Sequence, residues 1–346
     1  MAYITFQPSD YFNTKLYTGT GSSNAQTGVG FQPDWLWIKD RDSGSNSHII
    51  TDAIRGTNKI IFTDSNGVEL TDANRVTSFN SDGFTVGTDG STNTNTNDYV
   101  SWNWKANGQG SSNTDGTINT TYTSASTTSG FSICQWTGSG ANATIGHGLG
   151  VVPKMIMVKN LATTDSWNVY HESMGNNKRV FLDTTGDQST TSDAWNTTSP
   201  TTSVFSVGTN TGTNKSGDAL IAYCFAEIKG FSRIGFYTGN GSVSGPFVYT
   251  GFKPAFVLFK EYTGAGDANW VIQDSKRVGF NPNNNRLFPN DSAAENTSSF
   301  RIDMLSNGFK LTSNDGDANQ SGNDFLYMAF AEHPFVSSNN VPVTAR

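Results

Sequence analysis

Charged residues are scarce in this sequence. Asp, Glu, Lys and Arg make up 15% of the 346 residues, and 22 basic against 29 acidic side chains leave a net charge of −7. No run of lysines and arginines occurs anywhere along the chain. Because a general nucleic-acid binder needs clustered Lys and Arg to neutralise phosphates, we expect no nucleic-acid partner.

Long apolar runs are also missing. No stretch approaches the roughly 20 apolar residues that a membrane-spanning helix needs, so we expect no membrane insertion. Residues 1–10 lack the charged and then apolar layout of a secretory signal. These absences predict a soluble protein that is made in a cytoplasm.

Cysteine is nearly absent, with Cys134 and Cys224 as the two copies. Both lie in apolar, strand-like stretches, and nothing around them has the spacing of metal ligands. We interpret them as buried thiols. A disulfide between neighbouring strands is the alternative, which a cytoplasmic origin disfavours. No feature of the sequence calls for a cofactor.

The sequence is rich in Gly, Ser, Thr and Asn, which separate short apolar stretches containing most of the 23 Phe, 11 Tyr and 8 Trp. This composition disfavours long helices and favours short strands joined by turns. The aromatic side chains can supply the large buried faces that thin sheet layers need.

One ten-residue pattern is written three times: Gly, two residues, Pro, one residue, four apolar residues and Lys. The copies are residues 30–39, 150–159 and 251–260. A four-residue apolar run after a turn proline is typical of a short strand that is buried on both faces. The repetition therefore predicts three related units, each organised around this strand.

Other patterns recur in the same order in each unit, and together they predict the architecture. Several short strands per unit at this spacing indicate an all-β fold of three tandem related β-sandwich (jelly-roll-like) units. The predicted boundaries are 1–107 for the first repeat with its lead strand, 108–130 for a Gly/Ser/Thr/Asn linker or arm, 131–230 for the second repeat, 231–335 for the third repeat, and 336–346 for a C-terminal tail.

Each unit also has a Lys at the end of the repeated strand and an acid at the end of the next strand. The pairs are Lys39 with Asp52, Lys159 with Glu172, and Lys260 with Asp274. A Lys that ends a buried strand needs a partner for its charge. We therefore predict a Lys–carboxylate contact within each unit, with an architectural rather than a catalytic role.

Trp102 and Trp104 share one face of a strand that ends the first unit beside the linker. Indole rings can stack on sugars, so this pair is a candidate glycan-binding face. Core or inter-unit packing is the alternative.

A candidate calcium loop lies in the third unit. Asp315, Asp317 and Asn319 place three oxygen donors at alternate positions, as calcium-binding loops do. The loop lacks the glycine and the glutamate of an EF-hand at its sixth and twelfth positions, which are Gln320 and Leu326. An ordinary loop is the alternative.

No arrangement of residues marks an enzyme. No serine has a nucleophile-elbow setting, and the glycines around His147 are followed by a strand rather than by the helix of a dinucleotide site. His147 and His171 are interpreted as polar hairpin residues, and a pair of metal ligands that meet across a hairpin is the alternative. The acids are sparse and scattered, so they neither mark a paired-carboxylate glycosidase nor rule one out. We expect a protein without enzymatic activity.

Six short segments together resemble one protein family: residues 6–19, 30–35, 147–160, 223–227, 245–254 and 335–346. The combination is similar to a family of bacteriophage proteins that occurs in phages of marine cyanobacteria and other marine bacteria. Its members are described as virion structural or tail-fibre-like proteins. The resemblance covers nearly the whole chain, and because the family has no catalytic motif, it implies no active-site residue.

This resemblance implies a virion protein that is made in the host cytoplasm and contacts other virion proteins. The first hypothesis is a tail-fibre or receptor-binding component that forms a homo-oligomer and binds a host cell-surface glycan or protein through many weak contacts. A head decoration or capsid-bound fibre protein is the second hypothesis. A glycan-cleaving enzyme is the third.

Overall fold

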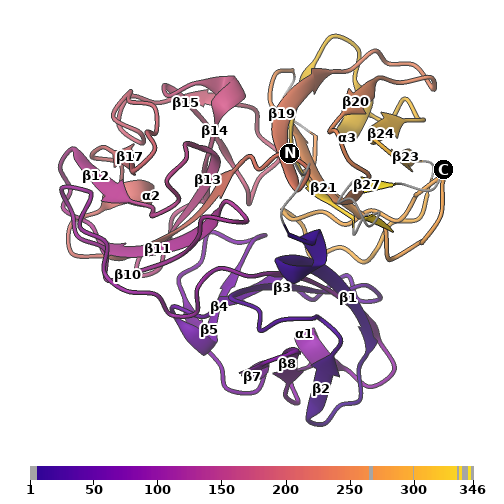
Figure 1. The fold of residues 1–346 in the computed structure, drawn as a ribbon, viewed down its shortest axis with the longest axis horizontal. Helices are drawn as coiled ribbons and strands as arrows, with labels where there is room; N and C mark the ends of the chain where they lie inside the picture. Colours follow the sequence, from indigo (N-terminus) through magenta and orange to yellow (C-terminus); the bar gives the residue numbers. More distant parts are fainter. Residues whose placement is uncertain (1–5, 265–267, 299, 333–334, 337–341, 344–346) are drawn as a thin grey trace.

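The computed structural model describes residues 6–264, 268–298, 300–332, 335–336 and 342–343. Within these ranges the chain forms strands joined by loops, with helices of only three or four residues, which confirms the all-β class. Three lobes follow one another along the sequence and surround a common centre (Figure 1). The first lobe runs from β1 (Phe12–Thr18) to β9 (Asp98–Trp104), the second from β10 (Tyr122–Ser126) to β18 (Ala219–Ala226), and the third from β19 (Ser232–Thr238) to β25 (Asp324–Ala331).

The first lobe has a large and a small sheet. The large sheet has the order β1-β9-β3-β4-β5-β6, and the small sheet has the order β2-β8-β7. A 3-10 helix, η1 (Pro8–Asp10), precedes β1. The remaining strands are β2 (Asn24–Thr27), β3 (Trp35–Asp40), β4 (Ile49–Asp52), β5 (Gly56–Phe62), β6 (Leu70–Thr71), β7 (Val76–Asn80) and β8 (Gly83–Val86).

The second lobe also has a large and a small sheet. Its large sheet has the order β10-β11-β18-β13-β14-β15-β16, and its small sheet pairs β12 with β17. Strand β10 lies within the segment 108–130 and pairs antiparallel with β11, so this part of the expected linker or arm extends the second large sheet. The remaining elements are β11 (Phe131–Thr137), β12 (Ala143–Gly146), β13 (Pro153–Asn160), β14 (Asn168–His171), η2 (Glu172–Met174), β15 (Lys178–Phe181), β16 (Ser189–Thr190) and β17 (Val204–Val207).

In the third lobe the large sheet has the order β19-β25-β21-β22 and the small sheet the order β20-β24-β23. Its strands are β20 (Phe247–Tyr249), β21 (Pro254–Glu261), β22 (Val271–Asp274), β23 (Ile302–Leu305) and β24 (Gly308–Leu311). A short pair, β26 (Phe335–Val336) with β27 (Pro342–Val343), follows. Most of the predicted tail, 336–346, lies outside the described residues, and the unit boundaries stay a prediction.

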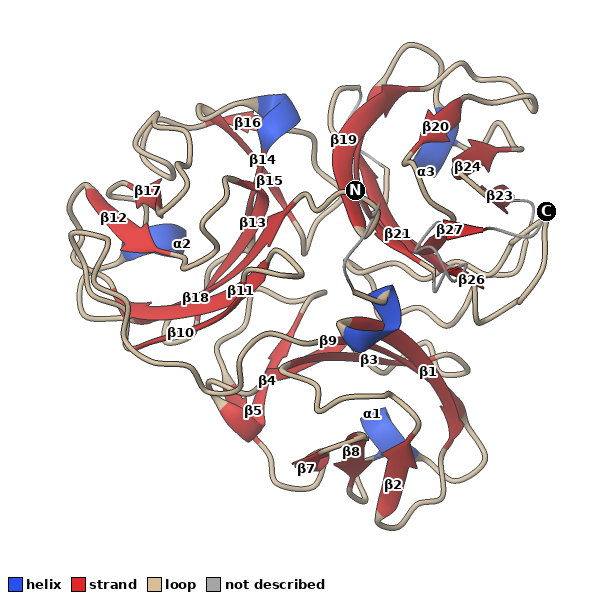
Figure 2. Cartoon of the chain, viewed as in Figure 1, coloured by secondary structure: helices blue, strands red, loops and turns tan. Residues whose placement is uncertain are grey.

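The repeated strand is buried on both faces in every lobe, as its sequence predicts. In β3, for example, Leu36 and Ile38 join the apolar cluster between the large and small sheets, whereas Trp35 and Trp37 join a central cluster. The central cluster takes the corresponding residues of all three large sheets, so the lobes share one core where their large sheets meet (Figure 2). This shared core places the large sheets of different lobes against each other.

Three one-turn helices recur at matched places, and sequence analysis did not anticipate them. They are α1 (Gly90–Asn93), α2 (Thr211–Asn214) and α3 (Gly316–Asn319). The residue before each helix, Asp89, Asn210 or Asp315, caps it with a side-chain oxygen, as N-cap residues do. An Asp or Asn followed four residues later by Asn is the sequence signal, which is too short to show a helical period.

Both cysteines are buried free thiols on neighbouring strands of the second large sheet. Burial raises the pKa of the Cys224 thiol well above its ordinary value. A thiol that stays protonated is a weak nucleophile, which fits the packing role expected for this pair.

Candidate functional site

Buried charged side chains contact one another and backbone carbonyls where two lobes meet. We call these contact zones the first seam (first and second lobes), the second seam (second and third lobes) and the third seam (third and first lobes). At each seam one strand of a large sheet, β4, β14 or β22, contacts a central strand of the next lobe, β18, β25 or β9. Matched positions can therefore be compared seam by seam.

The repeated lysines bind backbone carbonyls at the seams, and not the acids that we expected. Nζ of Lys39, in the first lobe, donates to the carbonyl oxygens of Asp40 at 2.7 Å, Ser43 at 3.2 Å and, across the third seam, Ser292 at 2.9 Å. Lys159 reaches the carbonyl of Asn66 across the first seam at 3.2 Å.

Lys260 completes the set by reaching the carbonyl of Thr185 across the second seam at 2.9 Å. All three lysines are fully buried. Each therefore ties its own lobe to a loop of a neighbouring lobe.

The predicted Lys–carboxylate pairs are wrong because of the strand register. In an antiparallel hairpin the end of one strand lies beside the start of the other, and Asp52, at the end of β4, pairs with Trp35 at the start of β3. Lys39 sits near the far end of the same strand. Burial lowers the pKa of each of the three lysines from 10.5 to about 8. The charges of nearby acids raise these pKa values, but burial has the larger effect.

Asp52 belongs to a buried network at the first seam. Its Oδ2 accepts hydrogen bonds from Nε of Arg55 at 2.6 Å and from the hydroxyl of Tyr223, in the second lobe, at 2.8 Å. Its Oδ1 accepts the backbone N–H groups of Ile54 and Arg55, which closes the turn after β4. Burial raises the pKa of the Tyr223 hydroxyl well above its ordinary value, so this group remains a hydrogen-bond donor.

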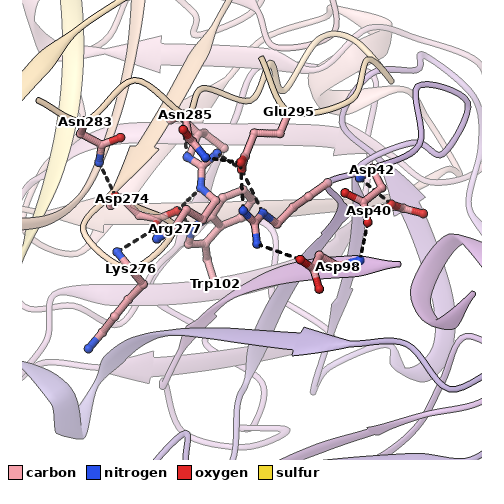
Figure 3. Close-up of polar contacts among 12 residues, drawn as sticks. Asp40, Asp42, Asp98, Trp102, Asp274, Lys276, Arg277, Asn283, Asn285 and Glu295 are labelled. Atoms are coloured by element: carbon pink, nitrogen blue, oxygen red, sulfur yellow. Dashed lines mark hydrogen bonds and ion pairs between the residues drawn. The ribbon is translucent and has the colours of Figure 1, made fainter. Parts of the chain in front are cut away.

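Asp274 makes the corresponding contacts at the third seam, which Figure 3 shows in close-up. Its Oδ2 accepts from Nε of Arg277 at 2.6 Å and from Nε1 of Trp102, in the first lobe, at 3.1 Å. The Arg277 guanidinium also lies over the Trp102 ring, 5.8 Å from its centroid. Trp102 thus takes the place that Tyr223 has at the first seam.

Glu295 extends this network across the third seam. Its two carboxylate oxygens accept from Nη2 of Arg41 at 2.9 Å and from Nη1 of Arg277 at 3.0 Å. Burial acts to raise the pKa of Glu295, but the hydrogen bond and the charge of Arg41, together with Arg277, outweigh it and lower the pKa. The buried part of the network joins Arg41 and Arg277 with Asp274 and Glu295, and the more exposed Asp98 lies 3.9 Å from Arg41.

The second seam has neutral residues at the same positions. His171 pairs with Met155 as Asp52 pairs with Trp35 and Asp274 with Phe256, so His171 is the counterpart of the two aspartates. Its Nδ1 accepts the backbone N–H of Ser173 at 3.2 Å. Burial lowers its pKa from 6.5 to about 4, so the ring is neutral at pH 7.

Glu172, the acid that the sequence pattern selects in the second unit, lies one residue beyond this position. Its side chain is 56% exposed and pairs with Lys154 at 3.0 Å. Three residues after His171 the chain has Met174, where the other two lobes have Arg55 and Arg277. The second seam therefore has no buried carboxylate–guanidinium pair at this place.

Trp102 and Trp104 are both in the central cluster, with 0% and 1% of their surfaces exposed. Trp104 packs against Trp35, with ring centroids 4.4 Å apart. Neither indole offers a face to a sugar, which corrects the glycan-binding interpretation, and the packing alternative describes both residues.

The three residues of the candidate calcium loop have protein partners. Oδ1 of Asp315 caps α3 and also pairs with Arg286 at 2.9 Å, and Asp317 accepts the backbone N–H of Asn269 at 2.7 Å. Asn319 is fully buried, and its amide donates to the carbonyls of Ser242 and Ser313. These contacts correct the calcium interpretation. No group of three or more His, Cys, Asp or Glu suited to a metal ion occurs among the described residues.

A polar cleft of about 350 Å³ lies beside α3 in the third lobe. It is lined by Glu261, Ala268, Asp315, Gly316, Asp317, Gln320 and Asn323. Burial raises the pKa values of Glu261 and Asp317. Arg286 holds Asp315 and Asp317, at 2.9 and 3.4 Å, so these two carboxylates are already paired. The cleft offers hydrogen-bond acceptors and amides to a hydroxyl-rich ligand.

Comparison with known proteins gives one result. The family described as "Domain of unknown function (DUF7483)" matches residues 7–334. No curated protein matches the chain. No helix in the part of the chain that the structure describes is long and apolar enough to span a membrane.

Proposed function

Since the chain belongs to the family described as a domain of unknown function (DUF7483), a description that states no activity, we propose a function from the sequence and the fold together. We propose that the protein is a non-enzymatic structural component of a bacteriophage virion. More narrowly, we propose a tail-fibre or receptor-binding component that contacts the host surface, as the resemblance to marine phage proteins implies.

The observation that carries this proposal is the way the protein uses its charged groups. The buried lysines, Arg55, Arg277 and the acids beside them have protein partners at the seams, where they hold lobes together. Groups that are saturated in this way support a scaffold role, because a catalytic acid or base must be free to exchange a proton with a substrate.

We also propose that the three lobes are tandem copies of one jelly-roll-like sandwich. In support, four strands of each large sheet have the same order: β1-β9-β3-β4, β11-β18-β13-β14 and β19-β25-β21-β22. Repeated units that present similar surfaces suit attachment through many weak contacts, and a homo-oligomer in the virion would multiply them further.

Antibody labelling of intact virions tests the location. We expect gold-labelled antibody raised against this protein to decorate the tail fibres in electron micrographs. Label on the capsid surface would favour a head decoration or capsid-bound fibre protein. Absence of label, together with absence of the protein from purified virions, would overturn the proposal.

A glycan-cleaving enzyme is the third candidate, after the two virion locations, and the cleft beside α3 is the observation that favours it, since it brings Glu261, Asp315 and Asp317 together. The purified protein should bind host envelope polysaccharide without releasing sugar. Sugar release that is lost in Glu261→Gln, with Glu172→Gln as the control for a surface acid, would establish the enzyme instead.

A further inference from the structure

The third lobe carries most of the exposed large apolar side chains of the described residues. Five of nine lie there: Phe236, Val243, Phe247, Tyr249 and Phe280. Exposed apolar patches on a protein surface often mark interaction sites. Two of the five, Phe247 and Tyr249, lie on one strand, β20.

Strand β20 is the edge of its small sheet, which has the order β20-β24-β23. Phe247 and Tyr249 are 45% and 61% exposed, whereas Val248 between them is 6% exposed and packs into the lobe. The outer side of the strand therefore combines a backbone that has no partner among the described residues with two aromatic rings. An open edge of this kind is a template for pairing with another strand.

The matched edge of the second lobe is covered by the chain itself. There, Ile118 forms a parallel bridge with Ile145 of β12. The backbone N–H of Ile118 donates to the carbonyl of Thr144 at 3.1 Å, and the backbone N–H of Thr144 donates to Oγ1 of Thr117 at 2.8 Å. A Cβ on Gly116 would lie 2.3 Å from the Thr144 carbonyl oxygen, so this close approach requires glycine.

The strand register shows which residue of β20 corresponds to Thr144. Ile145 pairs with Phe205, and Val248 pairs with Phe309, a buried phenylalanine at the same place in its sheet. Phe247 is thus the counterpart of Thr144. Because Thr144 directs its backbone N–H and C=O outward to the added segment, the backbone of Phe247 faces the open edge in the same way.

The first lobe supplies a comparison with the same geometry. Its edge strand β2 pairs Gln26 with Phe84, so Ala25 and Thr27 correspond to Phe247 and Tyr249. Both are exposed, and both are small. Within the part of the chain that the structure describes, the edge of the second lobe is covered, the edge of the first is open with small residues, and the edge of the third is open with aromatic residues.

We propose that the β20 edge of the third lobe binds an extended, uncharged segment of a different protein, which pairs in parallel with β20 as residues 116–118 pair with β12. The bound segment would place a glycine beside the Phe247 carbonyl, as Gly116 lies beside the Thr144 carbonyl. It would place an apolar residue beside Val248, as Ile118 lies beside Ile145. The side chains of Phe247 and Tyr249 would cover the side chains of the bound segment. This is strand addition to a sheet edge, in which the backbone supplies affinity and flanking side chains supply specificity.

A polypeptide fits this edge better than a glycan does, because the strand presents backbone donors and acceptors at the spacing of another strand. The segment that covers the matched edge of the second lobe indicates the chemistry of the occupant, because Gly116, Thr117 and Ile118 carry no charge. The inference does not require the host-binding role proposed above.

The test uses the full-length protein and a synthetic peptide with the sequence of residues 116–121, blocked at both ends so that it carries no charge. Hydrogen–deuterium exchange should show at least threefold slower exchange in the segment that contains residues 247–249 when the peptide is added, and no change with a scrambled peptide. The double variant Phe247→Ala/Tyr249→Thr, which reproduces Ala25 and Thr27 of β2, should weaken peptide binding at least tenfold. Its melting temperature should match the wild type, because both side chains are exposed.

The matched control is Val151→Ala/Val152→Ala, which removes two exposed apolar side chains of the second lobe and should leave peptide binding unchanged. Equal protection of β2 and β20, or full binding by the Phe247/Tyr249 variant, would overturn the proposal. Protection of β20 that depends only on protein concentration would make a second copy the occupant and would also overturn the proposal. Protection by an oligosaccharide but not by the peptide would do the same.

Discussion

Nε1 of Trp102 donates a 3.1 Å hydrogen bond to Oδ2 of Asp274, so that an indole of the first lobe and a carboxylate of the third meet in the central core. The two lobes are joined in sequence only through the second lobe, and the third seam between them is closed by non-covalent contacts. The same carboxylate oxygen holds Arg277 at 2.6 Å, which makes Asp274 the centre of this seam.

Replacing Asp274 by Ala should destabilise the protein by about 3–5 kcal/mol, because the variant leaves the Arg277 guanidinium buried without its closest acid. Urea unfolding monitored by tryptophan fluorescence measures the change. Glu172→Ala is the control: this acid is 56% exposed, and its loss should change the stability by less than about 1 kcal/mol. Equal effects of the two variants would contradict the role given to Asp274.

An aspartate without a paired arginine should destabilise the protein at the second seam. His171→Asp places a carboxylate in a fully buried site, beside a strand that offers Met328 where the other seams have Tyr223 and Trp102. We expect a loss of about 3 kcal/mol or more. Adding Met174→Arg should recover part of it, since the new guanidinium stands where Arg55 and Arg277 stand. A double-mutant cycle with no coupling between positions 171 and 174 would show that the seams are not equivalent.

Stability should rise with pH above about 8. The pKa of each seam lysine is about 8 in the folded protein and near 10.5 when exposed, so the unfolded chain binds more protons between these values. Stability then increases by up to roughly 1.4 kcal/mol per pH unit for each lysine in this window. Urea midpoints at pH 7, 8, 9 and 9.5 measure the slope, which Lys159→Met should reduce. A flat profile would mean that the carbonyl oxygens around Nζ keep the lysines charged.

Calcium should not stabilise the protein, because Asp315, Asp317 and Asn319 are held by protein groups. We expect the same melting temperature in millimolar calcium and in EDTA. In contrast, Asn319→Ala should cost about 1–3 kcal/mol, since it leaves the buried Ser313 carbonyl without its donor. Asn95→Ala, at an exposed position near the matched turn of the first lobe, is the control. A rise in melting temperature that depends on Asp317 would restore the calcium interpretation.

The repeated strand could be predicted from the sequence because its evidence is local. Four apolar residues between a proline and a lysine specify a strand that is buried on both faces, and Leu36 and Trp37 of β3 do face opposite clusters. The packing of Trp102 and Trp104 was among the alternatives, but a pattern of alternate residues does not tell a core face from a binding face.

The partners that the buried charges have across the seams could not be predicted, because they lie in other lobes. Lys39 contacts Ser292 and Asp274 contacts Trp102, at sequence separations that a pattern within one unit does not reveal. The error at Glu172 has a simpler cause. The hairpin between β13 and β14 differs in length from its counterparts, so spacing from the proline selects the residue after His171.

The central claim is that the three seams make the lobes one cooperative body. Native-state hydrogen exchange in increasing denaturant tests it most directly, since it gives an opening free energy for each strand. The claim predicts that the slowest amides of β9, β18 and β25 share one free energy of opening, and that Asp274→Ala lowers all three by the same amount. Three distinct free energies, with only the first and third lobes affected by Asp274→Ala, would contradict it.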